Sequence, residues 1–175
     1  MKSNVEVRQI DITELESDAI VNAANRHLAE GGGVCGAIFA KAGSDELREA
    51  CSKIGYCETG KAVITPGFHL KARFIIHAVG PIWQGGGERE AELLYSTYKE
   101  SLALSKNNLC RSIAFPLISS GIYGYPKREA WEIALKACSD FIVDNSDYTI
   151  DITFAVLSDG SRQMGENMIE EVFKK

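Results

Sequence analysis

Two glycine-rich loops in the sequence place main-chain amides where an anion could bind. The first is Gly31–Gly36, which leads into an apolar helical pattern, and the second is Ser119–Gly124, which follows a strand pattern and precedes an amphipathic helix. Bare amides at a helix N-terminus, with the positive end of the helix dipole, favour a phosphate group. Neither loop contains Lys or Arg. Each loop alone is explained by a tight turn, but two of them in one small sheet favour a diphosphate site at the strand ends.

Cys35 is the residue of the first loop with reactive chemistry. A helix N-terminus lowers the pKa of a thiol and favours a thiolate base or nucleophile. A free cysteine is more commonly a small apolar filler. No histidine lies near Cys35 in the sequence to serve as its base, and a bound diphosphate would oppose a thiolate. The sequence therefore leaves a catalytic and a packing role open.

Two phosphate-binding motifs match only in part. Gly31, Gly33 and Gly36 have the G-x-G-x-x-G spacing, but residues 22–30 separate them from the preceding strand pattern, and the chain is still helical about 20 positions later. The segment 55–62 resembles a P-loop, but it ends in alanine where Ser or Thr would bind magnesium, and a strand pattern follows. We therefore predict neither a dinucleotide cofactor nor a P-loop.

The histidines do not suggest a metal site. His27, His69 and His77 have no cysteine or acidic neighbours at metal-ligand spacing. We expect His77, which lies in an apolar run, to be a hydrogen-bonded core residue and the other two to lie in surface loops. We expect Asn22 to bridge backbone groups in a loop.

Alternating strand and helix patterns predict the elements that hold the two loops. β-branched and apolar runs predict strands at Val5–Ile10, Ala19–Ala23, Ala62–Thr65, Phe74–Val79, Ser112–Pro116 and Ile150–Leu157. Apolar periodicity predicts helices at Val34–Ala42, Asp45–Lys53, Glu88–Ser105, Lys127–Val143 and Asn167–Lys174.

This alternation predicts one domain over residues 1–175, folded as a three-layer α/β/α sandwich with a mixed, largely parallel sheet of about six strands. The first two strands have no helical pattern between them, so we expect some antiparallel pairing. We expect residues 83–90 to form a flexible loop.

Composition excludes several classes of function. The formal net charge is −5, and the basic residues are dispersed, so we expect no duplex nucleic-acid partner. The apolar runs are too short to span a membrane. The N-terminus lacks the charged-then-apolar pattern of a secretion signal, so we expect a cytoplasmic protein. The five cysteines include no C-x-x-C pair, which indicates reduced thiols.

Three runs of sequence carry a resemblance to a known family. They are "IDITELESDAIVNAANRHLAEGGGVCGAIFAKAG", "CETGKAVITPGFHLKARFIIHAVGPIW" and "SIAFPLISSGIYGYPKREAWEIA". Together they resemble the macrodomain family, especially its mono-ADP-ribosyl and O-acetyl-ADP-ribose hydrolases. The likeness extends over most of residues 5–145, with the motifs in the same order.

The resemblance implies roles for particular residues. Asp11 would accept a hydrogen bond from the adenine amino group beside Ile12, and Asn25 would meet the distal ribose. Without the family context, a cap for the turn that follows is as good an explanation of Asp11. The two loops would hold the diphosphate and distal ribose through Gly32, Gly33 and Val34 on one side and Ser119, Ser120, Gly121, Ile122 and Tyr123 on the other.

The chain departs from the family pattern at three positions. The resemblance implies an aspartate where this chain has Cys35 and a histidine or similar polar residue where it has Phe39. In the family, that aspartate and the equivalent of Asn25 act on a water molecule at the distal ribose. Leu157 lies near the place of an aromatic that stacks on adenine, and an aliphatic side chain loses about 0.5–1.5 kcal/mol of stacking.

Two functions follow from these departures. The protein is a binding module for ADP-ribose, O-acetyl-ADP-ribose or mono-ADP-ribosylated proteins, with hydrolysis weak or absent, or it is an active hydrolase or deacetylase that uses Asn25 and Cys35. A third class is a fold of this type used as a protein-interaction scaffold, or as a module that binds RNA or poly-ADP-ribose, although the acidic charge argues against RNA. We expect ADP-ribose as ligand or substrate, no cofactor and a monomer.

Overall fold

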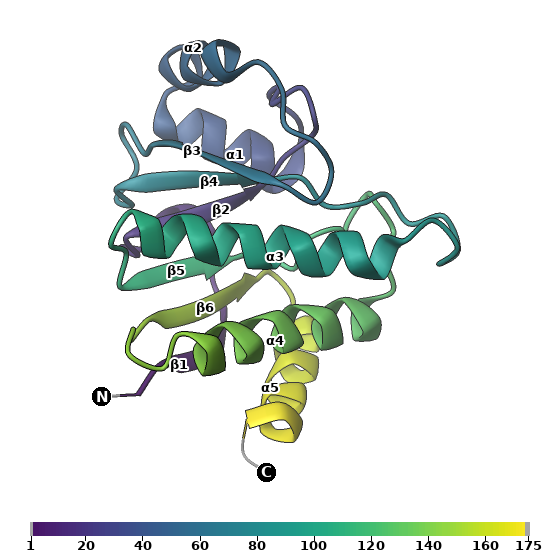
Figure 1. The fold of residues 1–175 in the computed structure, drawn as a ribbon. Helices are drawn as coiled ribbons and strands as arrows, with labels where there is room; N and C mark the ends of the chain where they lie inside the picture. The colour runs from purple at the N-terminus through teal and green to yellow at the C-terminus, as the bar shows by residue number, and fades with distance from the viewer. Residues whose placement is uncertain (1, 174–175) are drawn as a thin grey trace.

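The computed structural model describes residues 2–173, which form a sheet covered by helices on both faces (Figure 1). The strands are β1 Asn4–Gln9, β2 Ala19–Ala23, β3 Ala62–Pro66, β4 Phe74–Ala78, β5 Ser112–Phe115 and β6 Asp151–Val156. Their order in the sheet is β1-β6-β5-β2-β4-β3. All neighbouring pairs are parallel except β3 and β4. The mixed, largely parallel α/β/α sandwich predicted from the sequence is confirmed.

Helices lie on both faces because neighbouring strand residues point to opposite sides of the sheet. The helices are α1 Gly33–Ala42, α2 Ser44–Ile54, α3 Glu90–Asn107, α4 Lys127–Asp144 and α5 Asp159–Phe173. One apolar cluster joins α1 and α2 to the face that carries Ile20 and Ile75. The other joins α3, α4 and α5 to the face that carries Val21 and Ile76.

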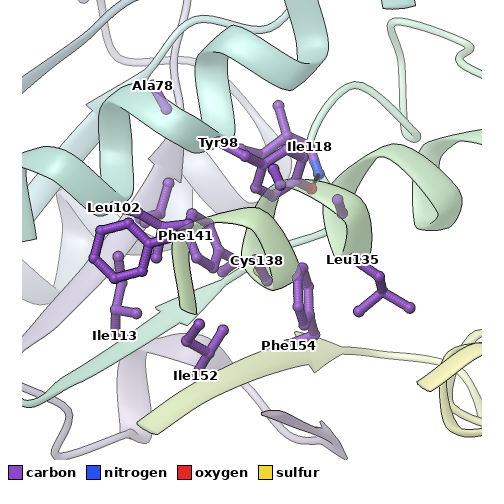
Figure 2. Close-up of a cluster of buried hydrophobic side chains, with 14 of the residues drawn as sticks. Ala78, Tyr98, Leu102, Ile113, Ile118, Leu135, Cys138, Phe141, Ile152 and Phe154 are labelled. Carbon is purple, nitrogen blue, oxygen red and sulfur yellow. Dashed lines mark hydrogen bonds between the residues drawn. The ribbon is translucent and has the colours of Figure 1, made fainter. Parts of the chain in front are cut away.

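The larger cluster fixes the exit of β5, from which the second loop leaves. Figure 2 shows Tyr98 of α3, Phe154 of β6 and their neighbours in this cluster. Phe154 is fully buried in mid-strand, as expected. The Tyr98 hydroxyl accepts a hydrogen bond from the Ile118 amide at 2.9 Å and donates to the Pro116 carbonyl at 3.4 Å. A buried side chain of α3 therefore holds the backbone that leads into the second loop.

Two details of the predicted fold are wrong. The expected antiparallel pairing is present, but it joins β3 to β4 rather than the first two strands. β1 pairs in parallel with β6 and is not a neighbour of β2 in the sheet. The last helix begins at Asp159 rather than at Asn167. Glycines hid its first turns, and one of them is needed for packing, because a Cβ on Gly165 would lie 2.7 Å from the ring of Trp131 in α4. The predicted end of this helix, Lys174, lies outside the described residues.

Candidate ligand-binding site

The two glycine-rich loops leave the sheet from adjacent parallel strands. β2 and β5 are paired only over Ala19 with Ile113 and Ile20 with Ala114, so their carboxyl ends separate. The chain continues from β2 to α1 on one face of the sheet and from β5 to α4 on the other. Such a switch point is where open α/β sheets bind ligands. The prediction that both loops lie at the ends of the strands of one sheet is confirmed.

Asn25 organises the backbone that leads into the first loop. Its Oδ1 accepts hydrogen bonds from the amides of His27 and Ala29, each at 3.1 Å, and its Nδ2 donates to the Ala29 carbonyl at 3.0 Å. Within residues 2–173, these bonds occupy both polar ends of the Asn25 side chain. The loop also turns through Leu28, whose φ is +56°.

The N-terminus of α1 is open to an anion. Gly32 is its N-cap, no side chain of the described residues caps it, and no acidic residue lies in its first turn. The helix begins at Gly33 in the left-handed region, with φ +57°. A Cβ on Gly36 would lie 2.7 Å from the Gly31 carbonyl oxygen, so only glycine allows this close turn. The first amides of α1 and its dipole are therefore free to attract a negative charge.

The Cys35 side chain is buried rather than exposed at the N-terminus of α1. It lies in the cluster beneath α1, and its Sγ is 3.8 Å from the same Ala29 carbonyl that Asn25 contacts. Phe39, one turn later, is fully buried in that cluster. Among the described residues, the Cys35 sulfur has no histidine or carboxylate partner. The geometry therefore favours the packing role for Cys35.

The second loop is a strained turn with exposed amides. Ser119 has a φ of +67°, and its buried hydroxyl has no hydrogen-bond partner among the described residues. The Ser119 carbonyl accepts from the amide of Tyr125 at 2.9 Å, and the Gly121 carbonyl accepts from Gly124 at 3.0 Å. Strain of this kind in a non-glycine residue concentrates at binding sites.

The tip of this loop projects into solvent. The Ile122 side chain is 96% exposed and Tyr123 is half-buried. Within the described part of the chain, the amides of Gly121, Ile122 and Tyr123 have no backbone or side-chain acceptor outside regular elements. Ser120 instead turns inward, because its hydroxyl donates to the Leu117 carbonyl at 2.7 Å.

Asp11 and Leu157 follow the carboxyl ends of two strands that lie on the other side of β5 from the first loop. They follow β1 and β6, which are parallel neighbours, and the Ile10 amide donates to the Val156 carbonyl at 3.0 Å. Leu157 is 71% exposed, whereas Ile12 is buried in the core. The two strands thus bring the backbone at Asp11 close to the backbone at Leu157.

Asp11 caps the short 3-10 helix Ile12–Glu14. Its Oδ1 accepts from the side chain of Thr13 at 2.7 Å and from the Thr13 amide at 2.9 Å. These bonds, the hydroxyl one foremost, lower the pKa of Asp11 below its ordinary value, so the carboxylate is ionised near neutral pH. The capping role weighed from the sequence is present, and Oδ2 accepts no hydrogen bond from the residues that the structure describes.

Gly80, which packs closely against Ile118 and Ser119 at the start of the second loop, was not identified from the sequence. Gly80 follows β4, and a Cβ placed on it would lie 2.6 Å from Cγ2 of Ile118 and closer still to the Ser119 hydroxyl. The two strand exits therefore touch at a point that only glycine fits. The position of Gly80 just beyond an apolar strand was the available signal.

The prediction that residues 83–90 form a flexible loop is wrong, because hydrogen bonds hold this segment in place. The amide of Trp83 donates to the Tyr123 carbonyl at 2.8 Å. The Glu90 carboxylate, only 1% exposed, accepts hydrogen bonds from three amides of this segment. This loop therefore belongs to the surroundings of the site.

His77 is a hydrogen-bonded core residue, as predicted. Its Nδ1 lies 3.1 Å from Asn22 Nδ2 and its Nε2 3.0 Å from the hydroxyl of Thr65. Burial lowers the pKa of His77 to about 4, so the ring is neutral. The prediction for Asn22 was wrong, because its side chain lies buried in β2 and bonds His77 rather than a loop backbone. The strand pattern around Asn22 could have placed it.

No group of three or more metal-ligating side chains gathers within residues 2–173. Over the same residues, no helix is both long and apolar enough to cross a membrane. Two surface hollows, of about 430 and 390 Å³, lie between α2 and β3 and between α3 and α4. Neither is lined by residues of the glycine-rich loops.

A largely parallel sheet with two anion-attracting loops at a switch point is the arrangement of α/β nucleotide-binding proteins. Comparison with known proteins narrows this class. The Macro domain family matches residues 21–134. The chain is 54% identical over 146 residues to the O-acetyl-ADP-ribose deacetylase of Salmonella newport (strain SL254), a stretch that covers 81% of each protein. The chain belongs to the Macro domain family.

Solved structures of the family have the same fold. The Oceanobacillus iheyensis macrodomain with ADP superposes with a TM-score of 0.92 at 38% identity, covering 99% of this chain and 96% of that one. The Trypanosoma brucei macrodomain in complex with ADP-ribose superposes with a TM-score of 0.88 at 35% identity, covering 95% of this chain and 69% of that one.

Proposed function

We propose that this protein binds ADP-ribose across the carboxyl ends of β1, β6, β5 and β2. The observation that carries the proposal is the order in which the loops follow one another across these strand ends. Asp11 and Leu157 lie at one end, the second loop follows, and Asn25 with the first loop comes last. Adenine, diphosphate and distal ribose follow one another in ADP-ribose in the same order.

Each part of the ligand then meets matching chemistry. The free carboxylate oxygen of Asp11 accepts from the adenine amino group, while Leu157 covers the ring. The amides of Gly33, Val34 and Ile122, with the α1 dipole, hold the diphosphate without any basic side chain. The ligand is ADP-ribose itself, O-acetyl-ADP-ribose or a mono-ADP-ribosylated protein. No cofactor takes part, and a monomer suffices because one chain supplies every loop.

We propose further that hydrolysis by this protein is weak. A general base has to lie within hydrogen-bond reach of the water it activates. Cys35 provides a buried thiol directed at the Ala29 carbonyl, where the family resemblance implies a carboxylate. The Asn25 side chain is engaged in holding the loop. Neither residue, as placed, offers a free base for the activation of water.

Active O-acetyl-ADP-ribose deacetylation is the second candidate. It is favoured by relatives such as the Salmonella newport protein, which carries that activity in its name and is 54% identical to this chain. In this case Asn25 and Cys35 supply the catalytic groups. Activation by a thiolate requires that Cys35 leave the Ala29 carbonyl when the substrate is bound.

Calorimetric titration with ADP-ribose tests the binding proposal. Saturable heat at micromolar ligand supports it, and no heat at high micromolar ligand contradicts it and leaves the scaffold alternative. Turnover of O-acetyl-ADP-ribose by the wild type, Cys35→Asp and Cys35→Ala then separates the two candidates. A lost base predicts that Cys35→Asp gains activity, whereas a thiolate mechanism predicts that Cys35→Ala loses it.

A further inference from the structure

The segment between β4 and α3 winds around one buried carboxylate. We call this segment, Trp83–Arg89, the strap. Glu90 is the first residue of α3, and its Oε2 accepts from the amides of Gln84 and Gly86, each at 2.9 Å, while its Oε1 accepts from Glu88 at 2.6 Å. These bonds, the one from Gln84 foremost, lower the pKa of Glu90. An ionised carboxylate therefore holds three main-chain donors.

The strap needs this support because its backbone is strained. Gly85 and Gly86 both have a φ of +93°, which glycine adopts without strain, but Arg89, a non-glycine residue, has a φ of +61°. Left-handed geometry at Arg89 is unfavourable by itself, so it persists only where the surroundings hold it. The three hydrogen bonds to Glu90 supply that hold.

The strap contacts the second loop at two places. The amide of Trp83 donates to the Tyr123 carbonyl at 2.8 Å, near the tip of the loop. The ring of Trp83 packs on the ring of Tyr125 with centroids 4.7 Å apart, and the Tyr125 amide closes the loop onto the Ser119 carbonyl. Burial first, and then the negative charges of Glu90 and Glu129, raise the pKa of Tyr125.

We propose that Glu90 is a positioning residue for ligand binding by the second loop. By holding the strap, it fixes Trp83, and Trp83 in turn fixes the peptide group of Tyr123 and the ring of Tyr125. Glu90 itself does not touch the ligand. The inference rests on the proposed binding of ADP-ribose, since its readout is the affinity of that site.

The chemistry of the carboxylate suggests a specific test. A glutamine in place of Glu90 keeps one acceptor oxygen but directs an NH₂ group at strap amides that are themselves donors. Glu92 provides a control for the loss of charge, because it lies in the same first turn of α3 and is exposed. Its partner within residues 2–173 is the exposed side chain of Arg89 at the end of the strap, and it accepts no hydrogen bond from the strap amides. Glu90→Gln and Glu92→Gln remove the same charge from the same helix end.

Calorimetric titration with ADP-ribose on both variants and the wild type measures the effect. We expect Glu92→Gln to bind like the wild type and Glu90→Gln to bind about ten- to a hundredfold more weakly, as loss of a hydrogen bond to a charged ligand group does. If the wild type binds ADP-ribose and Glu90→Gln binds it with the same affinity, this inference is refuted while the proposed function stands. A wild type that shows no binding contradicts the proposed function instead.

Fluorescence distinguishes positioning from general destabilisation. The chain has two tryptophans, and Trp131 is fully buried, so iodide quenching reports on Trp83. We expect a larger quenched fraction in Glu90→Gln than in Glu92→Gln, with the thermal midpoint of both well above the assay temperature. If Glu90→Gln does not fold, Trp83→Ala replaces it and is expected to lower affinity similarly. A folded Trp83→Ala with wild-type affinity refutes the inference.

Discussion

Replacing Gly80 by alanine perturbs the second loop through a single methyl group. The added Cβ would lie 2.6 Å from Cγ2 of Ile118, whereas carbon atoms in contact are separated by about 3.5–4.0 Å. Ile118 and Ser119 are 1% and 6% exposed, so neither side chain can swing into solvent. The backbone of the second loop must therefore move by roughly 1 Å.

The size of the effect follows from this overlap. Overpacking of a buried site costs about 1–3 kcal/mol. For a protein of this length, each kcal/mol lowers the thermal midpoint by about 2–4 °C. Displacement of the loop amides should also weaken ADP-ribose binding by about tenfold or more.

Thermal denaturation and calorimetric titration measure both effects. Gly87→Ala is the control, since a Cβ there meets no atom within 4 Å. Ser119→Gly in the Gly80→Ala background should recover part of the lost stability, because it removes the nearest overlapping atom and suits a φ of +67°. A Gly80→Ala protein with the midpoint and affinity of Gly87→Ala would refute the reasoning.

Two further predictions concern the first loop and the core. Gly32→Val should keep the thermal midpoint, because a Cβ at Gly32 meets no protein atom within 4 Å. It should weaken calorimetric binding of ADP-ribose, because its side chain would narrow the anion site, and unchanged affinity would contradict the placement of the ligand. The pKa of His77 is lowered from 6.5 to about 4, so its neutral form stabilises the fold fully above pH 6.5, and about 3 kcal/mol of this is lost as the pH falls to 4. Urea denaturation should show a smaller loss over that range for His77→Gln, and an identical pH dependence in both proteins would refute the assignment.

Most elements of the fold could be predicted from local patterns. β-branched runs identified the six strands to within about a residue at each end, since burial on both faces demands continuous apolar sequence. The two anion-attracting loops could also be recognised in the sequence, because few residues other than glycine adopt the backbone conformations of such tight strand-to-helix turns. The start of α5 was not visible, because its glycines serve contact with α4 rather than local helix propensity.

The sequence by itself determined the strands, most helices, the two lysine-free loops and the family resemblance, because these depend on residues close together in the chain. Only the tertiary structure decided that β1 lies beside β6, which joins Asp11 to Leu157, and that Gly80 and the strap support the second loop. It also decided that Asn25 and Cys35 share the Ala29 carbonyl. These contacts depend on strand order and on where side chains point, which local patterns do not encode.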